Sequence, residues 1–567
     1  MKKLVLSAFL AMATVAAATS GAVAQTQCPT APAAVVVPAG NISANTTWTR
    51  NNIYLLNGFV YVPSGVTLTI EPGTIIKGDL ANKGTLIIQR GGKLIADGTA
   101  AQPIVFTSNQ PAGSRAAGDW GGVIVCGRAP QNQPGDPIVE GGPVANYGGT
   151  DPADNSGIIR YVRIEYAGVP LQPNQEINGL TLAAVGNGTT IDYVQVSYSG
   201  DDSFEWFGGT VNAKHLIAFR GTDDDFDTDN GYSGRVQFGI GLRDPAVADA
   251  TATGASNAFE SDNDANGTIN TPRTSAVFSN MSVLLPGPLS AAAAEYRRGV
   301  HIRRNSAISL FNSVVTGYRT GVLVDGTLTE GALADGSSVF ANNVFADINS
   351  GSTSSYYSVN SGSSFDVNGY FNAASRANQT FTTVGALGLN TDNFAFNGNC
   401  GNAACAPTFA LPAASILNNG GVFTDAKLSG SGSGVNGAFT AVSYRGAFGA
   451  TNWAAGWTNF APQTTCYNRP SFTLATKPAA TGQLQSLSVS PNPTAGAALL
   501  SFELKQADVA TVRVVDALGR KVAVIEAGRL SAGPQQLSLP AELQNGVYLA
   551  TVTTSETSQT VRFVVAK

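Results

Sequence analysis

The chain has 567 residues, of which 13% are charged, and its formal net charge is -5. This balance gives no basic footprint for nucleic acid, so DNA and RNA are excluded as expected partners. Glycine (64 residues), serine, threonine, valine and asparagine are abundant, whereas the Leu-Glu-Lys stretches typical of helices are scarce. The composition therefore favours a body of strands and turns.

The N-terminal segment has the pattern of a secretory signal peptide. Two lysines precede an apolar run at residues 4–15, which is shorter than a bilayer span requires. Ala22 and Ala24 form a small-x-small cleavage site, so we expect residues 1–24 to be removed. The alternative, a membrane anchor, is disfavoured by the length of the run, and no later segment is predicted to cross a membrane.

Five cysteines in an exported chain allow at most two disulfides and leave one thiol over. Cys400 and Cys405 are close enough in sequence to close a small loop, while Cys28 and Cys466 flank the body and are a second candidate pair. Cys126 lies in an apolar run, and we expect it to be a buried free thiol. With two histidines and no Cys-x-x-Cys pattern, a zinc site is not expected.

An alternating strand that ends in a small or turn residue recurs along the body. The copies lie at residues 158–168, 190–200, 212–221, 277–287, 308–317 and, more weakly, 339–347. Most copies are 21 to 32 residues apart, and the single gap of 66 residues leaves room for one further coil. Earlier strands with the same character lie between residues 68 and 108.

A recurrence of this kind indicates stacked strand-rich units, and therefore a parallel β-helix rather than a helical solenoid. Each coil adds one strand spacing, roughly 4.8 Å, along the axis. The alternative is a large β-sandwich, but a sandwich has no reason to repeat in register. We predict an all-β protein: a right-handed parallel β-helix over residues 25–350, followed by irregular terminal coils and a linker over 351–480.

Four motifs carry a resemblance to a known group. They lie at residues 118–122 (Gly-Asp-Trp-Gly-Gly), 147–151, 201–209 and 298–305. Together they resemble a widespread group of secreted β-helix proteins of Bacteroidetes-type bacteria, over roughly residues 45 to 345. The resemblance implies fold and secretion and carries no established activity.

The character of the sequence changes at about residue 484. Strand patterns separated by short turns predict a small β-sandwich over residues 484–567. Pro-Asn-Pro at 491–493, Asp516-x-x-Gly-Arg, Asn545-Gly-x-Tyr and the terminal lysine occur in that order. The segment resembles the type A C-terminal sorting domain of type IX secretion cargo. The resemblance implies that the type IX machinery is a partner and that the protein is released or held at the cell surface.

Acidic residues in the middle of the body form the candidate site. Phe204-Glu205, Phe226-Asp227 and Phe259-Glu260 share one pattern, and the first two copies are 22 residues apart, about one coil. Because strand side chains alternate, inward phenylalanines place Glu205, Asp227 and Glu260 in an outward ladder. In the same register Val300 replaces the phenylalanine, His301 joins the ladder, and Arg303 follows Asp229 and Asp262.

Carboxylates about 5 Å apart repel one another by on the order of 1 to 3 kcal/mol per pair, so this ladder needs a counter-charge. The sources are arginines, a cation, or protonation of one acid. Oxygen ligands at this density suit calcium, although the spacing does not fit an EF-hand. The candidate metal ligands are Asp223, Asp225, Asp227, Asp229 and Asp262.

Paired acids can also act as general acid and base on an extended polysaccharide. The candidates for catalysis are Asp201, Asp202, Glu205, Asp227, Glu260, His301 and Arg303. Against this, the full motif set of polygalacturonases is missing, and a lyase would need calcium with a basic residue such as Arg303. A third interpretation is a salt-bridged structural ladder without function. We expect a surface-associated module that contacts glycan or matrix without catalysis; the alternative is a polysaccharide hydrolase or lyase.

Overall fold

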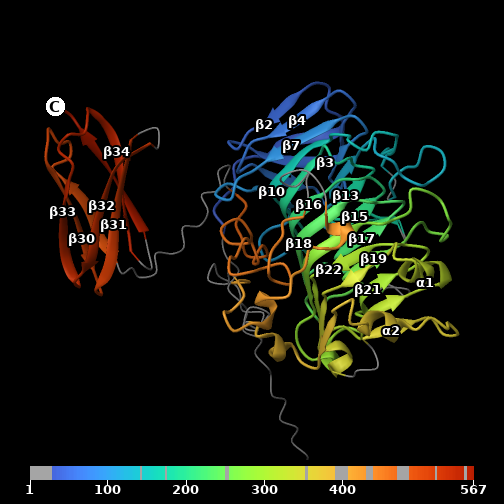
Figure 1. Cartoon of the computed structure of the whole chain (residues 1–567). Coiled ribbons are helices and arrows are strands. Elements are labelled where there is room, and N and C mark those ends of the chain that lie inside the picture. Colours follow the sequence, from blue (N-terminus) through green and yellow to red (C-terminus); the bar gives the residue numbers. More distant parts are fainter. Residues whose placement is uncertain are drawn as a thin grey trace, which may run out of the picture. The chain divides into compact units, whose positions relative to one another are not determined.

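The computed structural model describes residues 28–140, 143–172, 175–249, 255–351, 356–389, 407–429, 439–468, 484–516, 520–554 and 558–567. The chain separates into two compact units, Met1–Phe472 and Thr473–Lys567, which we treat one at a time (Figure 1). The predicted signal peptide and the predicted Cys400–Cys405 pair lie outside the described residues.

Three parallel ladders of strands build the larger unit. Sheet 1 contains β2 (Thr46–Trp48), β4 (Thr67–Ile70), β7 (Lys93–Asp97), the first halves of β10 (Gly157–Glu165), β14 (Thr190–Ser197), β16 (Ala213–Phe219), β18 (Arg235–Leu242) and β20 (Val277–Leu284), then β22 (Ser309–Phe311) and β25 (Phe340–Ala341). Sheet 2 contains the first half of β3 (Ile53–Val62), β5 (Ile75–Gly78), β8 (Ile104–Ser108), the second halves of β10, β14, β16, β18 and β20, then β23 (Val314–Thr316), β26 (Val344–Ala346) and β28 (Gln379–Phe381).

Sheet 3 carries the predicted acidic ladder. It contains the second half of β3, β6 (Thr85–Ile88), β9 (Val123–Cys126), β13 (Leu180–Ala183), β15 (Phe204–Phe207), β17 (Phe226–Asp229), β19 (Phe259–Ser261), β21 (Arg298–Ile302), β24 (Thr320–Val324) and β27 (Tyr357–Val359). The edge strand β1 (Val35–Asn41) pairs with β3. The topology is that of a right-handed parallel β-helix, as predicted, and β18 is the coil expected in the long gap of the repeat.

Strands β10, β14, β16, β18 and β20 pass from sheet 1 to sheet 2 without a loop. Each bends at one residue with positive φ, which is Tyr161, Tyr193, His215, Phe238 or Asn280 on successive coils. A left-handed backbone costs a non-glycine residue roughly 1 kcal/mol. Ring stacking along the axis, with centroids 4.4 Å apart for Tyr161–Tyr193 and 4.2 Å apart for Tyr193–His215, offsets part of that cost.

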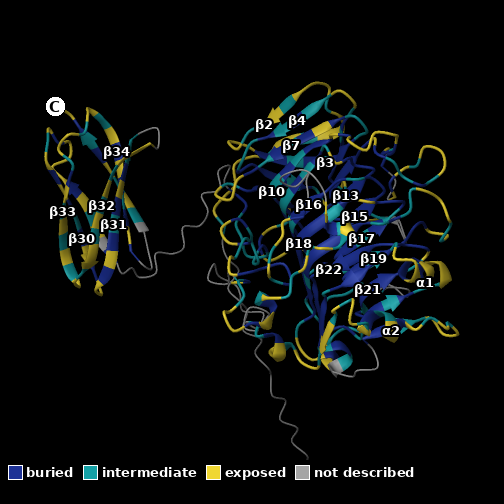
Figure 2. Cartoon of the chain, in the orientation of Figure 1, coloured by how far each residue is buried: buried dark blue, intermediate teal, exposed yellow. Residues whose placement is uncertain are grey.

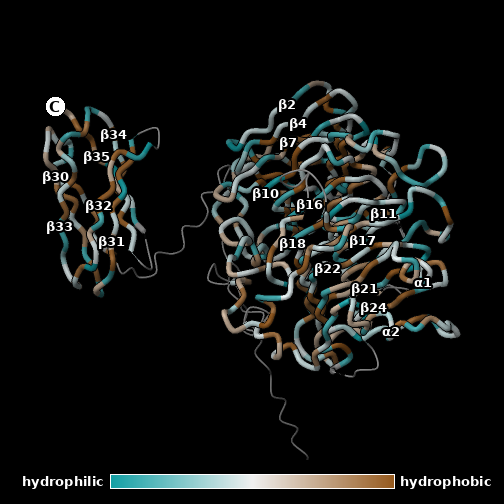
Figure 3. Tube along the Cα trace, in the orientation of Figure 1, coloured by the Kyte–Doolittle hydropathy of each residue, from teal (hydrophilic) through white to brown (hydrophobic). Residues whose placement is uncertain are grey.

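Apolar side chains fill the inside of the coils. Buried residues concentrate on the strands of the body, and exposed residues lie mainly in its turns and loops (Figure 2). Hydrophobic segments recur from coil to coil (Figure 3). One continuous core therefore runs along the stack, which is what a repeat of half-buried strands requires.

Two short helices, a hairpin and irregular segments also belong to this unit. The helices are α1 (Thr327–Ala334) and α2 (Val367–Asn372), and the hairpin is formed by β11 (Pro170–Gln172) and β12 (Gln175–Glu176). Residues 439–468, which we call the strap, lie along the outside of the coils. Cys466 at the end of the strap is disulfide-bonded to Cys28, and Cys126 is a buried free thiol, as predicted for both.

The smaller unit consists of two antiparallel sheets. One contains β29 (Leu484–Ser490), β30 (Ala498–Leu504) and β33 (Gly533–Leu539); the other contains β32 (Lys521–Leu530), β31 (Asp508–Asp516), β34 (Gly546–Thr553) and β35 (Ser558–Val565). Alternate residues of β30 and β31 are buried and contribute to one separate core. This is the small β-sandwich that the sequence predicts.

Candidate functional site

The register of sheet 3 confirms the predicted ladder. Glu205 lies opposite Asp227, and Asp227 lies opposite Glu260, on neighbouring strands. His301 follows Glu260 in the same outward row, as the spacing predicts. The inward phenylalanines of these strands stack with ring centroids 5.7 and 5.3 Å apart, and this packing fixes the direction in which the acids point.

A second row of polar residues runs beside the ladder. It lies two residues before each inward side chain, in the turns that lead into the strands, and consists of Asn178, Asp202, Asp224 and Asn257. The row is tied together by hydrogen bonds: the Asp224 N–H donates to Asp202 Oδ1 at 2.8 Å, and the Asn257 N–H donates to Asp224. Asp202 is among the predicted catalytic residues, whereas the two asparagines were missed.

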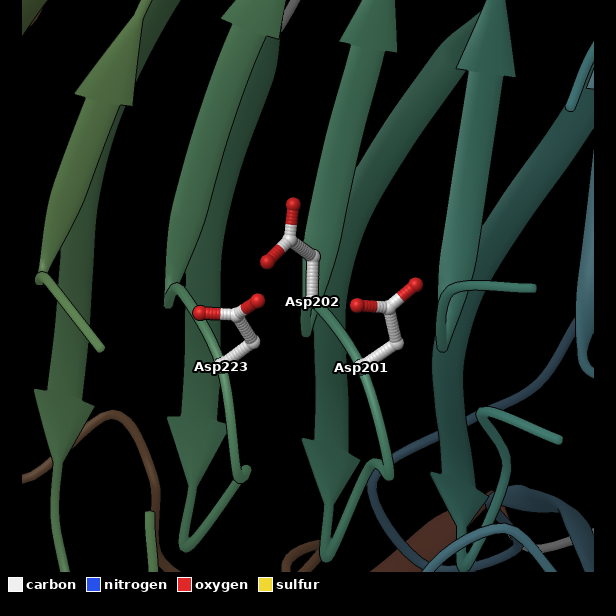
Figure 4. Close-up of side chains that lie close together, drawn as sticks. All are labelled: Asp201, Asp202 and Asp223. Carbon is white, nitrogen blue, oxygen red and sulfur yellow. The ribbon is translucent and has the colours of Figure 1, made fainter. Parts of the chain in front are cut away.

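Carboxylates of the two rows, together with Asp201 and Asp223 just before the second row, form three overlapping groups. These are Asp201 with Asp202 and Asp223, Asp202 with Glu205 and Asp227, and Asp224 with Asp227 and Glu260. Within each group the ligand oxygens lie within 4.8 Å of one another, and Figure 4 shows the first group side by side. We call these seven residues the acidic cluster.

The acidic cluster is recessed rather than freely exposed. Asp202, Glu205 and Asp224 are 7%, 6% and 4% exposed. Burial first, and then the neighbouring carboxylates, raise the pKa of each of these acids well above its ordinary range. The same causes act on Asp227, and they raise the pKa of Asp223 to about 7. Ionising the whole cluster therefore needs compensating positive charge.

Arginines supply that charge at one end only. Arg303 pairs with Glu260 and, at 2.8 Å, with Asp262; Arg304 also pairs with Asp262, at 2.6 Å. Burial raises the pKa of Glu260, but hydrogen bonding to His301 and the charge of Arg303 outweigh it, so that the net shift is downward. Within the described part of the chain, the other six acids of the cluster form no ion pair with a lysine or arginine.

Several buried oxygens in this region have no hydrogen-bond donor. They are Asn178 Oδ1, Thr181 Oγ1, Asp227 Oδ1 and Asn257 Oδ1. Thr181 occupies the outward position next to Glu205, while both asparagines donate their amide N–H groups to carboxylates of the cluster. Buried polar atoms normally find partners. A row of buried acceptors beside unpaired carboxylates is an environment that favours a cation.

The candidate metal ligands divide between different surroundings. Asp223 and Asp227 belong to the acidic cluster, whereas arginines bind Asp262. Asp229 continues sheet 3 opposite Phe207 and accepts a hydrogen bond from the neighbouring Asn230 N–H. The positions of Asp227, Asp229 and Asp262 are consistent with the alternation from which they were predicted.

Asp225 is placed differently from the other candidate ligands. Its side chain is fully buried and pairs with the equally buried Arg243 at 3.1 Å, outside the three groups of carboxylates. It lies in the turn before β17 rather than in the strand, so strand alternation does not govern its direction. This pair belongs to the interior of the coils.

Two further acids come from segments outside the repeat. Glu140 lies within hydrogen-bonding reach of Glu205 and Asn178, and the charge of Glu176 in β12 acts on both Glu140 and Asp201. Sequence reasoning missed both, because neither lies at a fixed offset from an inward side chain of the repeat.

Comparison with known proteins places this geometry in a family. Residues 40–387, more than half of the chain, match the family described as a pectate-lyase-like β-helix domain. The chain belongs to this family. Residues 488–566 of this β-helix protein match a secretion system C-terminal sorting domain, as the sequence resemblance predicted. The protein is therefore type IX secretion cargo that is exported to the cell surface or the extracellular space.

Other comparisons add little. No match was found among curated proteins. A similar solved structure is full-length tailspike protein 2 of Escherichia coli O157:H7 bacteriophage CAB120, with 10% identity and a TM-score of 0.17. The alignment covers 89% of the β-helix protein and 64% of the tailspike chain, so the protein spans less than two thirds of the tailspike. Among the described residues, no helix has the length and apolarity needed to cross a bilayer.

The two basic residues beside the cluster that were predicted for catalysis, His301 and Arg303, both lie against carboxylates. His301 lies between Glu260 and Asp325, with Nδ1 at 3.5 Å and Nε2 at 3.3 Å from their carboxylate oxygens. The charges of Glu260 and Asp262 raise the pKa of Arg303 despite its partial burial, which lowers it. A guanidinium held in this way stays protonated and is a poor proton acceptor. This disfavours Arg303 as the base of a lyase.

Proposed function

We propose that this β-helix protein is a secreted binding module without catalysis, whose acidic cluster holds calcium and presents it to a glycan at the cell surface or in the matrix. The observation that carries the proposal is the set of buried, donor-free oxygens among carboxylates without a basic partner. A cation would satisfy these oxygens and the like charges together.

The ligand set fits calcium better than magnesium. Calcium takes six to eight oxygens at about 2.3–2.6 Å, so opposite ligands lie up to about 5 Å apart. The carboxylate oxygens of each group lie within 4.8 Å of one another. The oxygens available are carboxylates of Asp202, Glu205 and Asp227 with the amide and hydroxyl oxygens of Asn178 and Thr181 beside them. Magnesium usually keeps several of its waters and is seldom held by an all-protein cage.

Calcium would link the recessed acids to a ligand outside. When bound, calcium supplies a positive charge and coordinates hydroxyl and carboxylate oxygens of a sugar. In this proposal Asp202, Glu205 and Asp227 hold the ion, and Arg303 at the other end of the cluster keeps Glu260 ionised.

A panel of immobilised acidic and neutral polysaccharides tests this function. We expect binding that requires calcium, disappears with a chelator and is reduced at least about tenfold in Asp227→Asn. The matched control is Asp136→Asn, which removes an exposed carboxylate that pairs with Arg90 outside the cluster. Glycan binding that is indifferent to calcium and to Asp227→Asn would overturn the proposal.

One observation favours the alternative of a polysaccharide hydrolase or lyase. Glu205 has a raised pKa and lies close to Asp202 and Asp227, so a protonated and an ionised carboxyl can coexist there. Reducing-sugar and unsaturated-product assays on the same panel distinguish the two functions. Turnover by the wild type that is lost in Glu205→Gln would establish the enzyme, whereas calcium-dependent binding without product supports the module.

A further inference from the structure

From β16 onward the outward face of sheet 2 is largely apolar, unlike that of sheet 3. Ile217, Ile240 and Val314 occupy outward positions on its coils, and each is at most 1% exposed. Phe448 and Trp457 of the strap pack over Ile217 and Ile240, whereas Leu387 and Leu417, outside the strap, pack with Val314. A contiguous apolar strip is rarely left exposed by a monomeric soluble protein, so this face depends on its cover.

Side-chain amides attach the strap to the coils in a recurring way. Gln195 accepts from the Asn459 N–H at 2.9 Å and donates to the Asn459 carbonyl at 2.8 Å. Gln237 binds the N–H and the carbonyl of Thr440 in the same way, both at 2.8 Å. Each side-chain amide thereby binds both backbone groups of one strap residue, as a neighbouring strand would in a sheet. Isolated pairs of this kind contribute only about 1 kcal/mol per hydrogen bond.

A covalent bond fixes the far end of the strap. Cys466 is bonded to Cys28, 438 residues earlier, just before the first coil begins at β1. The adjacent Tyr467 O–H donates to the buried Glu165 at 2.6 Å. Both cysteines are only partly buried, so a small thiol in solvent can reach the bond.

We propose that the strap is a redox-sensitive latch. With the disulfide intact, the strap is held over sheet 2. Once the bond is reduced, the strap opens as a unit and uncovers the apolar surface around Ile217 and Ile240, while the coils stay folded. The coils are held by continuous backbone ladders. The strap is held by side-chain clamps, by isolated backbone hydrogen bonds such as that from the Gly446 N–H to the Asn312 carbonyl, by apolar contacts and by one covalent bond. An external dithiol supplies two electrons and two protons, becomes a disulfide itself, and leaves Cys28 and Cys466 as thiols.

Hydrogen exchange measured by mass spectrometry on the folded full-length protein tests the latch. Oxidised protein is compared with protein treated with dithiothreitol, and the intact mass confirms that the bond is reduced. We expect peptides covering Thr440, Ala447 and Asn459, whose N–H groups bond to side chains of the coils, to exchange at least about tenfold faster after reduction. Peptides covering β14 and β16 are expected to be unchanged.

Two results overturn the latch. In one, the strap exchanges at the same rate with the bond reduced; in the other, the strap and the coils accelerate together, which would mean that the disulfide stabilises the whole unit. The Cys466→Ser variant provides a second test. Its strap peptides are expected to exchange hydrogen fast whether or not dithiothreitol is present. If this variant does not fold, reduction of the folded wild type still decides between the outcomes.

Discussion

Calcium is expected to stabilise the protein more at alkaline than at acidic pH. Burial and neighbouring acids raise the pKa of Asp223 from 3.8 to about 7 and that of Asp229 to about 8. In the unfolded chain both titrate near 3.9, so between these values the folded state binds more protons than the unfolded state. Without calcium, the protonated forms of Asp223 and Asp229 stabilise the folded state at low pH, and this stabilisation is lost as the pH rises towards 8.

The size of this effect follows from the shift itself. For Asp223 alone, the change from 3.8 to about 7 corresponds to at most about 4 kcal/mol, and solvent near the site reduces that figure. A cation at the carboxylates reverses the penalty. With calcium at about 100 times its dissociation constant, the gain is about 2.7 kcal/mol, or roughly 3 °C in Tm for a unit of this length.

Scanning calorimetry in calcium and in chelator, at about pH 5.5 and about pH 8, measures this linkage. We expect the calcium-induced rise in Tm to be clearly larger at the higher pH, since fewer protons must then leave the site. Asp136→Asn, outside the acidic cluster, should behave like the wild type. A calcium-induced rise in Tm that is the same at both pH values, or smaller at the higher pH, would contradict competition between calcium and protons at these acids.

Three other predictions concern the interior and the ladder. Arg243→Met leaves Asp225 without its buried partner and should cost about 3–5 kcal/mol in denaturant unfolding, whereas adding Asp225→Leu should recover much of the loss; a double variant as unstable as the single one would contradict this. Phe226→Ala removes a ring stacked between those of Phe204 and Phe259 and should cost about 3–5 kcal/mol, while a loss below about 1 kcal/mol would contradict close packing there. Arg303→Gln should lower Tm in chelator more than in calcium, and equal losses in both conditions would count against charge compensation at this end.

The fold could be predicted from the sequence because its signals are local and repeated. The phenylalanine spacing gave the register of sheet 3, and alternation gave the direction of Glu205, Asp227 and Glu260. The same reasoning carried over to His301, since the strand register continues across β21. The sorting domain was recognisable because its turn motifs stand in a fixed order.

Features outside regular strands could not be predicted. Asp225 lies in a turn, where strand alternation does not predict the direction of a side chain. Its buried partner Arg243 follows β18 and has no counterpart in the repeat from which the ladder was predicted. Asn178 and Asn257 lie at the same offset from an inward side chain as Asp202 and Asp224. They were missed because the site was predicted from acidic residues alone. The strap has little regular structure, and its pairing with glutamine side chains depends on contacts between residues more than 200 positions apart.

Isothermal titration of calcium into chelator-treated, desalted full-length protein measures directly whether the acidic cluster binds the ion. We expect saturable binding by the wild type, unchanged binding by Asp136→Asn, and at least about tenfold weaker binding by Asp227→Asn, which removes a carboxylate shared by two of the three groups. Absence of saturable binding by the folded wild type, or equal binding by Asp227→Asn, would contradict a calcium site in the acidic cluster.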